Sequence, residues 1–251
     1  MAFSIVFWNV WMDNQTKGTQ HAAPLLAALD EMVKRYNPVV FAFNEIVKLR
    51  EGKTPFVLAR LARHGYQYVH FELTGTEEGG WELGDAIVSR EKLYDEQVYI
   101  LSERVGSSDK HKTIALNAKV CHDGTSVTIL VAHLPVLQKN LLAKHFRCQQ
   151  KLAAHIRSFS LAANLIAVGD YNEPTLFPVS LISRVGHMMH VRSGTTLSPT
   201  WHSRASPHAI ARANPDKLFW MKQSELRLQQ FAVLPFDASD HKPLYAEFTL
   251  G

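Results

Sequence analysis

Short, strongly apolar runs recur along this chain, and several of them end abruptly in polar residues. Such runs, rich in β-branched and aromatic residues, are typical of buried strands. They lie at residues 4–10, 39–43, 66–73, 85–89, 114–120, 126–132, 165–168 and 245–250. The dipeptide Asp123-Gly124 separates two of them and predicts a tight hairpin turn. Strands therefore outnumber helices in the expected fold.

Three segments carry the spacing of helices: residues 24–36, 54–63 and 141–157. Pro24 stands near the start of the first, and Pro38 follows its end. In residues 141–157 the apolar residues share one side, and the basic residues are expected on the solvated side. The expected apolar residues are Leu141, Leu142, Phe146, Leu152 and Ile156. The expected solvated residues are Lys144, Arg147, Lys151 and His155.

The order of these elements predicts an α/β fold. A strand, a helix and a strand in succession imply a parallel, right-handed crossover. Both crossovers and hairpins occur, so we expect mixed sheets, packed face to face with helices outside. Apolar runs and turn signals are spread evenly, and we see no linker or internal repeat. We therefore expect residues 1–251 to form a single domain.

Composition and charge restrict the function classes only mildly. The formal net charge of +4 suits a polyanionic substrate but equally an ordinary soluble protein. Cys121 and Cys148 match no metal spacing, and we expect both to be free, buried thiols of a reducing compartment. The first residues lack a basic region and a cleavage site, and no apolar stretch is long enough to span a membrane. We expect a soluble, cytoplasmic protein, with no protein partner identifiable.

Polar residues follow the buried runs at four places: Asn9, Asn44-Glu45, His133 and Gly169-Asp170. The crossovers place Asn9 beside Glu45, and His133 beside Asp170, at the same end of their strands. Asp240-His241 precedes the last run, and an antiparallel last strand would begin at that end too. Any one such residue is more often a turn former or a helix cap. Their convergence predicts a site for a metal ion and acid/base chemistry.

Short motifs in this chain resemble those of the endonuclease/exonuclease/phosphatase superfamily, which includes pancreatic deoxyribonuclease and the abasic-site endonucleases. The most specific pair is Gly169-Asp170-Tyr171-Asn172 followed by Ser239-Asp240-His241. The other matches occur in the family's order: Trp8-Asn9-Val10, Asn44-Glu45-Ile46, residues 84–90, Ala132-His133-Leu134, Pro199-Thr200-Trp201 and Asp216-Lys217-Leu218-Phe219. The resemblance covers nearly the whole chain. It implies a four-layer α/β sandwich.

The resemblance also implies a divalent metal, usually Mg²⁺ with Mn²⁺ as the alternative, and roles for individual residues. Glu45 matches the main metal ligand, with Asn9 and Asp240 nearby. Asp170 and Asn172 match the pair that positions the attacking water and the phosphate, and extended backbone would point both side chains the same way. His133 matches a histidine that contacts the phosphate or assists the leaving group. Asp216 matches the carboxylate that orients the final histidine, here His241.

Three departures from the family's pattern stand out. Trp11 and Met12 occupy a position that is often acidic, although Asp13 follows closely, and this weakens the case for a second metal. Asn44-Glu45 replaces a Gln-Glu pair, and Asp85 stands where Asn is usual. None of the central acidic or histidine positions is missing, so we expect an active enzyme.

The substrate is less constrained by the sequence. We expect a nuclease acting on DNA or RNA, endo or exo, with His202 and Arg204 binding substrate and His208 and Arg212 nearby. An ordinary polar loop explains these residues equally well. Trp81 is expected to cover the core rather than to stack on a base. The alternative within the fold is a small-molecule or lipid-headgroup phosphatase, although Glu173-Pro174 stands where the inositol phosphatases carry Arg.

The sequence disfavours two other function classes. A catalytically inactive binding module is disfavoured by the intact acidic and histidine set. A zinc hydrolase is disfavoured because the chain has neither an H-E-x-x-H motif nor a dense histidine run.

Overall fold

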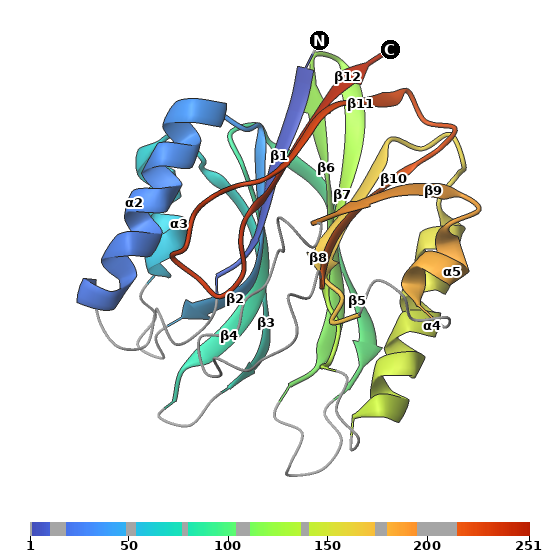
Figure 1. Cartoon of the computed structure of the whole chain (residues 1–251), viewed down its shortest axis with the longest axis horizontal. Coiled ribbons are helices and arrows are strands. Elements are labelled where there is room, and N and C mark those ends of the chain that lie inside the picture. The colour runs from blue at the N-terminus through green and yellow to red at the C-terminus, as the bar shows by residue number, and fades with distance from the viewer. Residues whose placement is uncertain are drawn as a thin grey trace.

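Two six-stranded sheets pack face to face, and helices cover both outer faces (Figure 1). The computed structural model describes residues 2–10, 19–48, 54–76, 80–103, 111–136, 141–173, 180–194 and 215–251. His202 and Arg204, predicted to bind substrate, lie outside these residues, as do His208, Arg212 and Asp13. No described helix is long and apolar enough to cross a membrane.

The first sheet has the strand order β11-β12-β1-β2-β4-β3. Its strands are β1 (Ala2–Asn9), β2 (Val40–Lys48), β3 (Tyr68–Thr76), β4 (Glu82–Ser89), β11 (Leu226–Val233) and β12 (Leu244–Leu250). Strands β1 and β2 are parallel, as the intervening helix predicted, and β12 is antiparallel to β1. Helices α2 (Thr19–Tyr36) and α3 (Phe56–Arg63) pack on its outer face.

The second sheet has the order β5-β6-β7-β8-β10-β9. Its strands are β5 (Leu93–Ser102), β6 (Thr113–His122), β7 (Thr125–His133), β8 (Leu165–Asp170), β9 (Met189–Ser193) and β10 (Asp216–Met221). The β6–β7 hairpin turns at Asp123-Gly124, as predicted, and β7 and β8 are parallel. Helices α4 (Leu142–Ser158) and α5 (Leu181–Val185) cover its outer face.

Three buried apolar layers follow from this arrangement, and strand β1 shows why the sequence produces them. Ile5 and Phe7 face the second sheet, whereas Val6 and Trp8 face the helices. Because both faces of the strand are buried, its sequence is a continuous apolar run rather than an alternating one. The predicted four-layer α/β sandwich is thus confirmed.

Several predicted boundaries were wrong. Helix α2 begins at Thr19, so Pro24 lies inside it rather than near its start. Strand β2 runs on to Lys48, so Asn44 and Glu45 lie within the strand rather than after it. Four strands (β5, β9, β10 and β11) and the short helix α5 were not predicted. Most residues of β5 are exposed, so no buried apolar run marked that strand.

The predicted faces of helix α4 were partly wrong. Leu152 and Ile156 are buried as expected, but Leu142 is exposed and Lys144 is buried. Lys144 is buried because its ammonium group donates a hydrogen bond to the His111 carbonyl oxygen at 2.9 Å. Cys148 is a buried free thiol as expected, whereas Cys121 is exposed.

Candidate active site

The polar ends of four strands meet at one pole of the sandwich. Asn9 at the end of β1 is the lateral neighbour of Asn44 in β2. His133 at the end of β7 is the neighbour of Asp170 at the end of β8. Asp170 is also the neighbour of Asp216, where β10 begins. The two sheets therefore deliver their polar residues to one place.

Gly169 allows β7 and β8 to approach closely beside this site. A Cβ atom at Gly169 would lie 1.9 Å from the Ala132 carbonyl oxygen, well inside any tolerated contact. Only glycine fits at such an approach of two backbones. The glycine of the Gly169-Asp170 motif is thus explained by packing, and it sets the position of the aspartate that follows.

A bulge in strand β2 turns Glu45 into the site. The β2–β4 register shifts between Phe43 and Ile46, and Glu45 lies in the left-handed backbone region with φ of 60°. Left-handed backbone is unfavourable for a residue with a side chain, and such strain is concentrated at functional sites. The Glu45 side chain remains 23% exposed, so it is accessible to solvent and to a ligand.

Asp170 is the centre of the hydrogen-bond network. Its Oδ2 atom accepts a hydrogen bond from Asn9 Nδ2 at 3.1 Å, and its Oδ1 atom accepts one from the Asn172 backbone N–H at 2.9 Å. Asn9 Nδ2 also donates to Glu45 Oε1 at 3.1 Å. The Nε2 atoms of His133 and His241 lie 3.7 and 3.6 Å from Asp170 Oδ2. One amide thus links the two acidic residues, and two histidines flank Asp170.

Asn172 lies beside Asp170 for a different reason from the one predicted. Its backbone is not extended but left-handed, with φ of 48°. The side-chain Nδ2 atom of Asn172 donates a hydrogen bond to the Leu134 carbonyl oxygen at 2.8 Å. The turn after β8, rather than strand alternation, brings the two residues together.

His241 is held by the residue predicted to orient it. Its Nδ1 atom donates to Asp216 Oδ2 at 2.9 Å, and this fixes the ring so that Nε2 faces Asp170. Trp8 Nε1 donates to the His241 carbonyl oxygen at 2.8 Å, and the Ser239 hydroxyl donates to the Asn9 carbonyl oxygen at 2.9 Å. Both the side chain and the backbone of His241 are therefore fixed. Asp240 lies at the edge of this group, with its Oδ1 atom 4.0 Å from His241 Nε2.

The carboxylates shift the titration of both histidines. Burial alone would lower the pKa of His241, but the charges of Asp216 and Asp170 outweigh it and raise the pKa to about 10. Burial opposes protonation of His133 as well, and its pKa is nevertheless raised, chiefly by Asp170 and Glu45. At neutral pH in the absence of metal, His241 carries a proton on each ring nitrogen.

The acidic residues can hold a divalent cation. Carboxylates outnumber histidines here, and removing so much negative charge from water is costly without a counter-charge. They are Glu45, Asp170, Asp216 and Asp240. Oxygen ligands of this kind suit Mg²⁺, which keeps several of its waters. The oxygen donors and partial exposure of Glu45 therefore fit such an ion.

One compact group of possible ligands is Asp170, Asp216 and His241, whose ligand atoms all lie within 4.8 Å of one another. This group differs from the predicted set of Asn9, Glu45 and Asp240. All three side chains are buried, and His241 Nδ1 and Asp216 Oδ2 are already hydrogen-bonded to each other. Glu45 and Asp240 are more exposed than these three residues, with side-chain exposures of 23% and 16%.

Two further residues of the site, Asn44 and Asp85, were noticed only as departures from the family's motifs. Asn44 Nδ2 donates to Asp85 Oδ1 at 2.8 Å, and Asn44 Oδ1 accepts from the Asp170 backbone N–H at 3.0 Å. A hydrogen bond therefore crosses between the two sheets at Asp170. Burial raises the pKa of Asp85 to about 6. The sequence signal for both residues was their place in family motifs: Asn44 directly precedes Glu45, and Asp85 lies in the motif at residues 84–90.

Comparisons with known proteins identify the family and agree with the fold. The sequence matches the Endonuclease/Exonuclease/phosphatase family over residues 6–241. No curated protein matches the sequence significantly.

Three solved structures are similar to this fold over almost the whole chain. The human Nocturnin catalytic domain with bound sulfate is 18% identical, with a TM-score of 0.72, over 100% of this chain and 95% of that one. TDP2 of D. rerio with a single-strand DNA product is 17% identical, with a TM-score of 0.68, over 99% of both chains. The mannosyl-6-phosphatase Bt3783 of Bacteroides thetaiotaomicron VPI-5482 is 17% identical, with a TM-score of 0.66, over 98% and 99%. The chain belongs to the endonuclease/exonuclease/phosphatase family, a superfamily of phosphoester hydrolases that generally use a divalent metal.

Proposed function

We propose that this protein is a Mg²⁺-dependent phosphodiesterase that acts on nucleic acid, with Mn²⁺ as an alternative ion. One observation carries the proposal: Glu45, Asp170 and the Asp216–His241 pair converge from both sheets on one polar site. Both cysteines are unpaired, which supports a cytoplasmic location as part of the same proposal.

The metal ligands in this proposal are Glu45, Asn9 and Asp240. When bound, a divalent cation stabilises negative charge on the phosphoryl oxygens and assists the leaving oxygen. Asn9 has a second task, because its amide nitrogen keeps the Glu45 and Asp170 carboxylates side by side. Without that donor the two carboxylates would repel each other.

Asp170 is the proposed base for the attacking water, with Asn172 as the residue that positions water and phosphate. The Asn172 backbone N–H occupies Oδ1 of Asp170. Asp216 accepts the Nδ1 proton of His241 and leaves Nε2 facing Asp170, so a protonated Nε2 can donate a hydrogen bond to a phosphate oxygen. We therefore assign His241 to hydrogen bonding with the phosphate oxygens. Asp216 keeps the His241 ring oriented and protonated. His133 faces the same region and is assigned to the phosphate or the leaving group.

Nucleic acid as substrate is supported by the TDP2 neighbour, which was solved with a single-strand DNA product, and by the mild positive charge of the chain. In this proposal His202 and Arg204 bind phosphates that flank the cut bond. A small phosphoester is the second candidate. It is favoured by the mannosyl-6-phosphatase neighbour and by a cavity of limited volume beside Glu45, of about 290 Å³.

Hydrolysis of bis-4-nitrophenyl phosphate tests the catalytic part of the proposal. We expect turnover with Mg²⁺ or Mn²⁺ and its loss in EDTA. Glu45→Gln, Asp170→Asn and His241→Ala should each lower kcat by at least about 100-fold, because each removes a group that acts on the transition state. Glu96→Gln, on the exposed strand β5, is the matched control and should keep full activity. Near-normal turnover in any of the three site variants would show that the site is wrongly assigned.

A substrate panel tests the nucleic-acid part. It comprises single- and double-stranded DNA and RNA, inositol phosphates and sphingomyelin, each assayed with Mg²⁺. A nuclease should cleave an oligonucleotide fastest, and added salt should weaken oligonucleotide binding because phosphate contacts release counterions. A flat salt response, together with preference for an inositol phosphate, would favour the second candidate.

A further inference from the structure

A cavity of about 290 Å³ opens directly beside the proposed catalytic residues. Glu45 and His133 are among its lining residues. Apolar side chains form much of the remaining wall, among them Leu83, Leu134 and Val136. The cavity and the catalytic site thus share two residues, so a molecule bound at one reaches the other.

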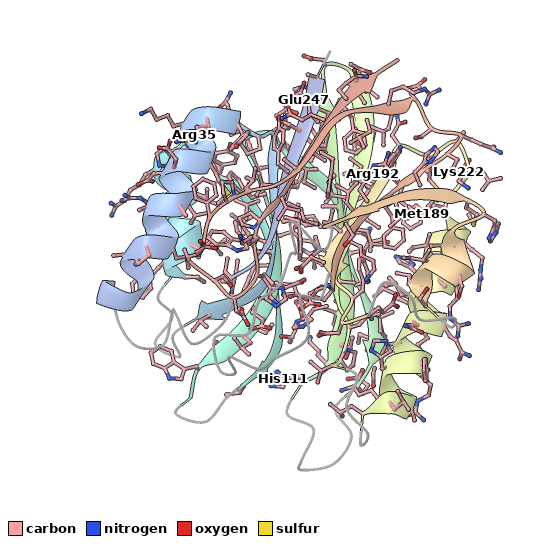
Figure 2. All side chains as sticks on the ribbon, viewed as in Figure 1. Arg35, His111, Met189, Arg192, Lys222 and Glu247 are labelled. Carbon is pink, nitrogen blue, oxygen red and sulfur yellow. The ribbon has the colours of Figure 1, made fainter. Side chains whose placement is uncertain are left out.

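Part of the cavity wall is a contact between the two sheets, made by Thr74 and Gly75 of β3 with His111 and Lys112 ahead of β6. We call this contact the seam. Gly75 in β3 forms a backbone bridge with His111, and the Lys112 backbone N–H donates to the Thr74 carbonyl oxygen at 2.9 Å. A Cβ atom at Gly75 would lie 2.1 Å from the His111 ring, so the ring lies directly against this strand. In Figure 2, His111 is labelled at the end of the molecule opposite the chain termini marked in Figure 1.

Two lysines strengthen the seam. The Lys112 ammonium group pairs with Glu72, and the buried Lys144 of helix α4 donates to the His111 carbonyl oxygen at 2.9 Å. The seam is therefore tied to β3 on one side and to α4 on the other. Backbone bonds and ion pairs of this kind form the cavity before any ligand arrives, which lowers the cost of binding.

The lining determines what kind of group the cavity accepts. Its apolar wall favours an uncharged, apolar group over a hydrated one. The only acidic side chain among the described lining residues is Glu45, whereas Lys112 and Lys144 are basic. Glu72 balances the charge of Lys112, so the anionic phosphate of a ligand belongs beside Glu45 and His133, where the cation is proposed to bind. A ring attached to a phosphate diester has this combination.

We propose that the cavity binds a ring-bearing organic group esterified to the phosphorus atom under attack. The inference rests on the proposed function and specifies its substrate: a diester with a nucleoside or aryl substituent, rather than one with only small alkyl groups. The group comes either from a nucleotide of a nucleic acid or from a free small ester. Leu134 and Val136 contact the ring, while Glu45 and His133 remain beside the phosphate.

Three diesters with the same leaving group test this proposal. Methyl, phenyl and thymidine 5′-esters of 4-nitrophenyl phosphate all release 4-nitrophenolate, so differences in kcat/KM report the second substituent. We expect the ring-bearing esters to exceed the methyl ester by about tenfold or more. Faster turnover of the thymidine ester identifies a nucleotide as the source, and faster turnover of the phenyl ester identifies a small aryl ester.

A variant that fills the cavity supplies the decisive comparison. Val136→Trp places a large side chain at the cavity, and because Val136 is 39% exposed the new side chain does not have to enter the buried core. Val98→Trp in β5 is the matched control, because Val98 is 37% exposed and does not line the cavity. Val136→Trp should abolish the preference for a ring, measured as the ratio of kcat/KM for a ring-bearing ester to kcat/KM for the methyl ester, whereas Val98→Trp should keep this ratio. An equal effect on all three esters would overturn the proposal.

A binding measurement keeps the test independent of turnover. Diphenylphosphinate and dimethylphosphinate are anionic like a diester, but their P–C bonds are not hydrolysed. Calorimetric titration in Mg²⁺ should show tighter binding of the diphenyl compound to the wild type, and no such preference in Val136→Trp. If this preference is present and no ester is hydrolysed, the proposed function fails and the cavity assignment stands. If the esters are hydrolysed without any preference in rate or binding, the cavity assignment fails and the function stands.

Discussion

His241 shows how single residues set the chemistry of this site. Its ring is buried, and burial disfavours the charged form, yet two carboxylates hold the second proton in place. Asp216 contributes most of this effect, because it is both a direct partner and a buried charge. The residue that fixes the ring therefore also fixes its protonation state.

Asp216→Asn should separate these two contributions. The substitution keeps the shape of the side chain but removes its charge, so the pKa of His241 should fall by more than one unit and kcat by at least about 100-fold. An NMR titration of the His241 ring measures the first effect, and hydrolysis of bis-4-nitrophenyl phosphate measures the second. Asp95→Asn is the control, because Asp95 is an exposed residue of β5 that forms an ion pair with Lys119 of β6. An unchanged His241 titration would show that Asp216 does not hold the proton.

The same histidine predicts a pH dependence of stability in EDTA. A raised pKa means that the folded state binds this proton more tightly than the unfolded chain, in which the pKa is near its ordinary value of about 6.5. The resulting stabilisation is complete below that value and is lost as the pH rises through about 10. The free energy of unfolding, measured by denaturant titration, should therefore fall over this window. In Asp216→Asn the fall should be smaller, and an identical slope would contradict the assignment.

At the scale of elements, strand β2 carries a strained residue into the site. A regular strand would point Glu45 away from its neighbour Asn44, because successive side chains alternate between the faces. The bulge breaks this alternation and brings Glu45 to Asn9 while Asn44 still reaches Asp170. The left-handed backbone at Glu45 is the energetic cost of this arrangement.

A pair of substitutions measures that strain. At an ordinary strand position, Gly is less stable than Ala by about 0.5–1 kcal/mol, whereas left-handed backbone costs a residue with a Cβ atom about 1–2 kcal/mol. Glu45→Gly should therefore be more stable than Glu45→Ala by about 1 kcal/mol. Thermal and denaturant unfolding provide the comparison, with Val98→Gly and Val98→Ala as the control pair, because Val98 is exposed and regularly paired with Leu116 in β5. The control pair should show the opposite order, and the same order at both positions would argue against strain at Glu45.

At the scale of the whole molecule, the site joins the two sheets. Asn9, Asn44 and His241 belong to the first sheet or its connections, and each bonds to Asp170 or Asp216 of the second. A ligand that binds this pole acts on the contact between sheets as well as on a single strand. That residues 1–251 form a single domain stays a prediction.

Mg²⁺ should therefore stabilise the fold. A ligand that binds only the folded state raises stability by RT ln(1 + [L]/Kd), which is about 2.7 kcal/mol at 100 times the Kd. Thermal unfolding in Mg²⁺ should give a higher Tm than unfolding in EDTA. Glu45→Gln should remove most of this difference, and Glu96→Gln should retain it. A Tm that Mg²⁺ does not change in the wild type would count against a metal site at this pole.

Much of the fold could be predicted because burial leaves a direct trace in the residues. Strands β1, β7 and β8 are covered on both faces, so their sequences are continuous apolar runs. Strand β5 is mostly exposed and leaves no such trace, so it was missed. Lys144 was misplaced for a related reason: helical periodicity records only the common preference of lysine for water and not a specific carbonyl partner.

The sequence by itself determined the strands that carry apolar runs, the three longer helices and the polar residue types that follow those runs, because these features depend on local spacing and burial. Only the tertiary structure decided how these ends meet: the Glu45 bulge, the turn at Asn172, the Asn44–Asp85 link and the seam at His111. Each depends on contacts between segments far apart in the chain. Such contacts follow from sheet register and backbone geometry, and no local pattern of residues records them.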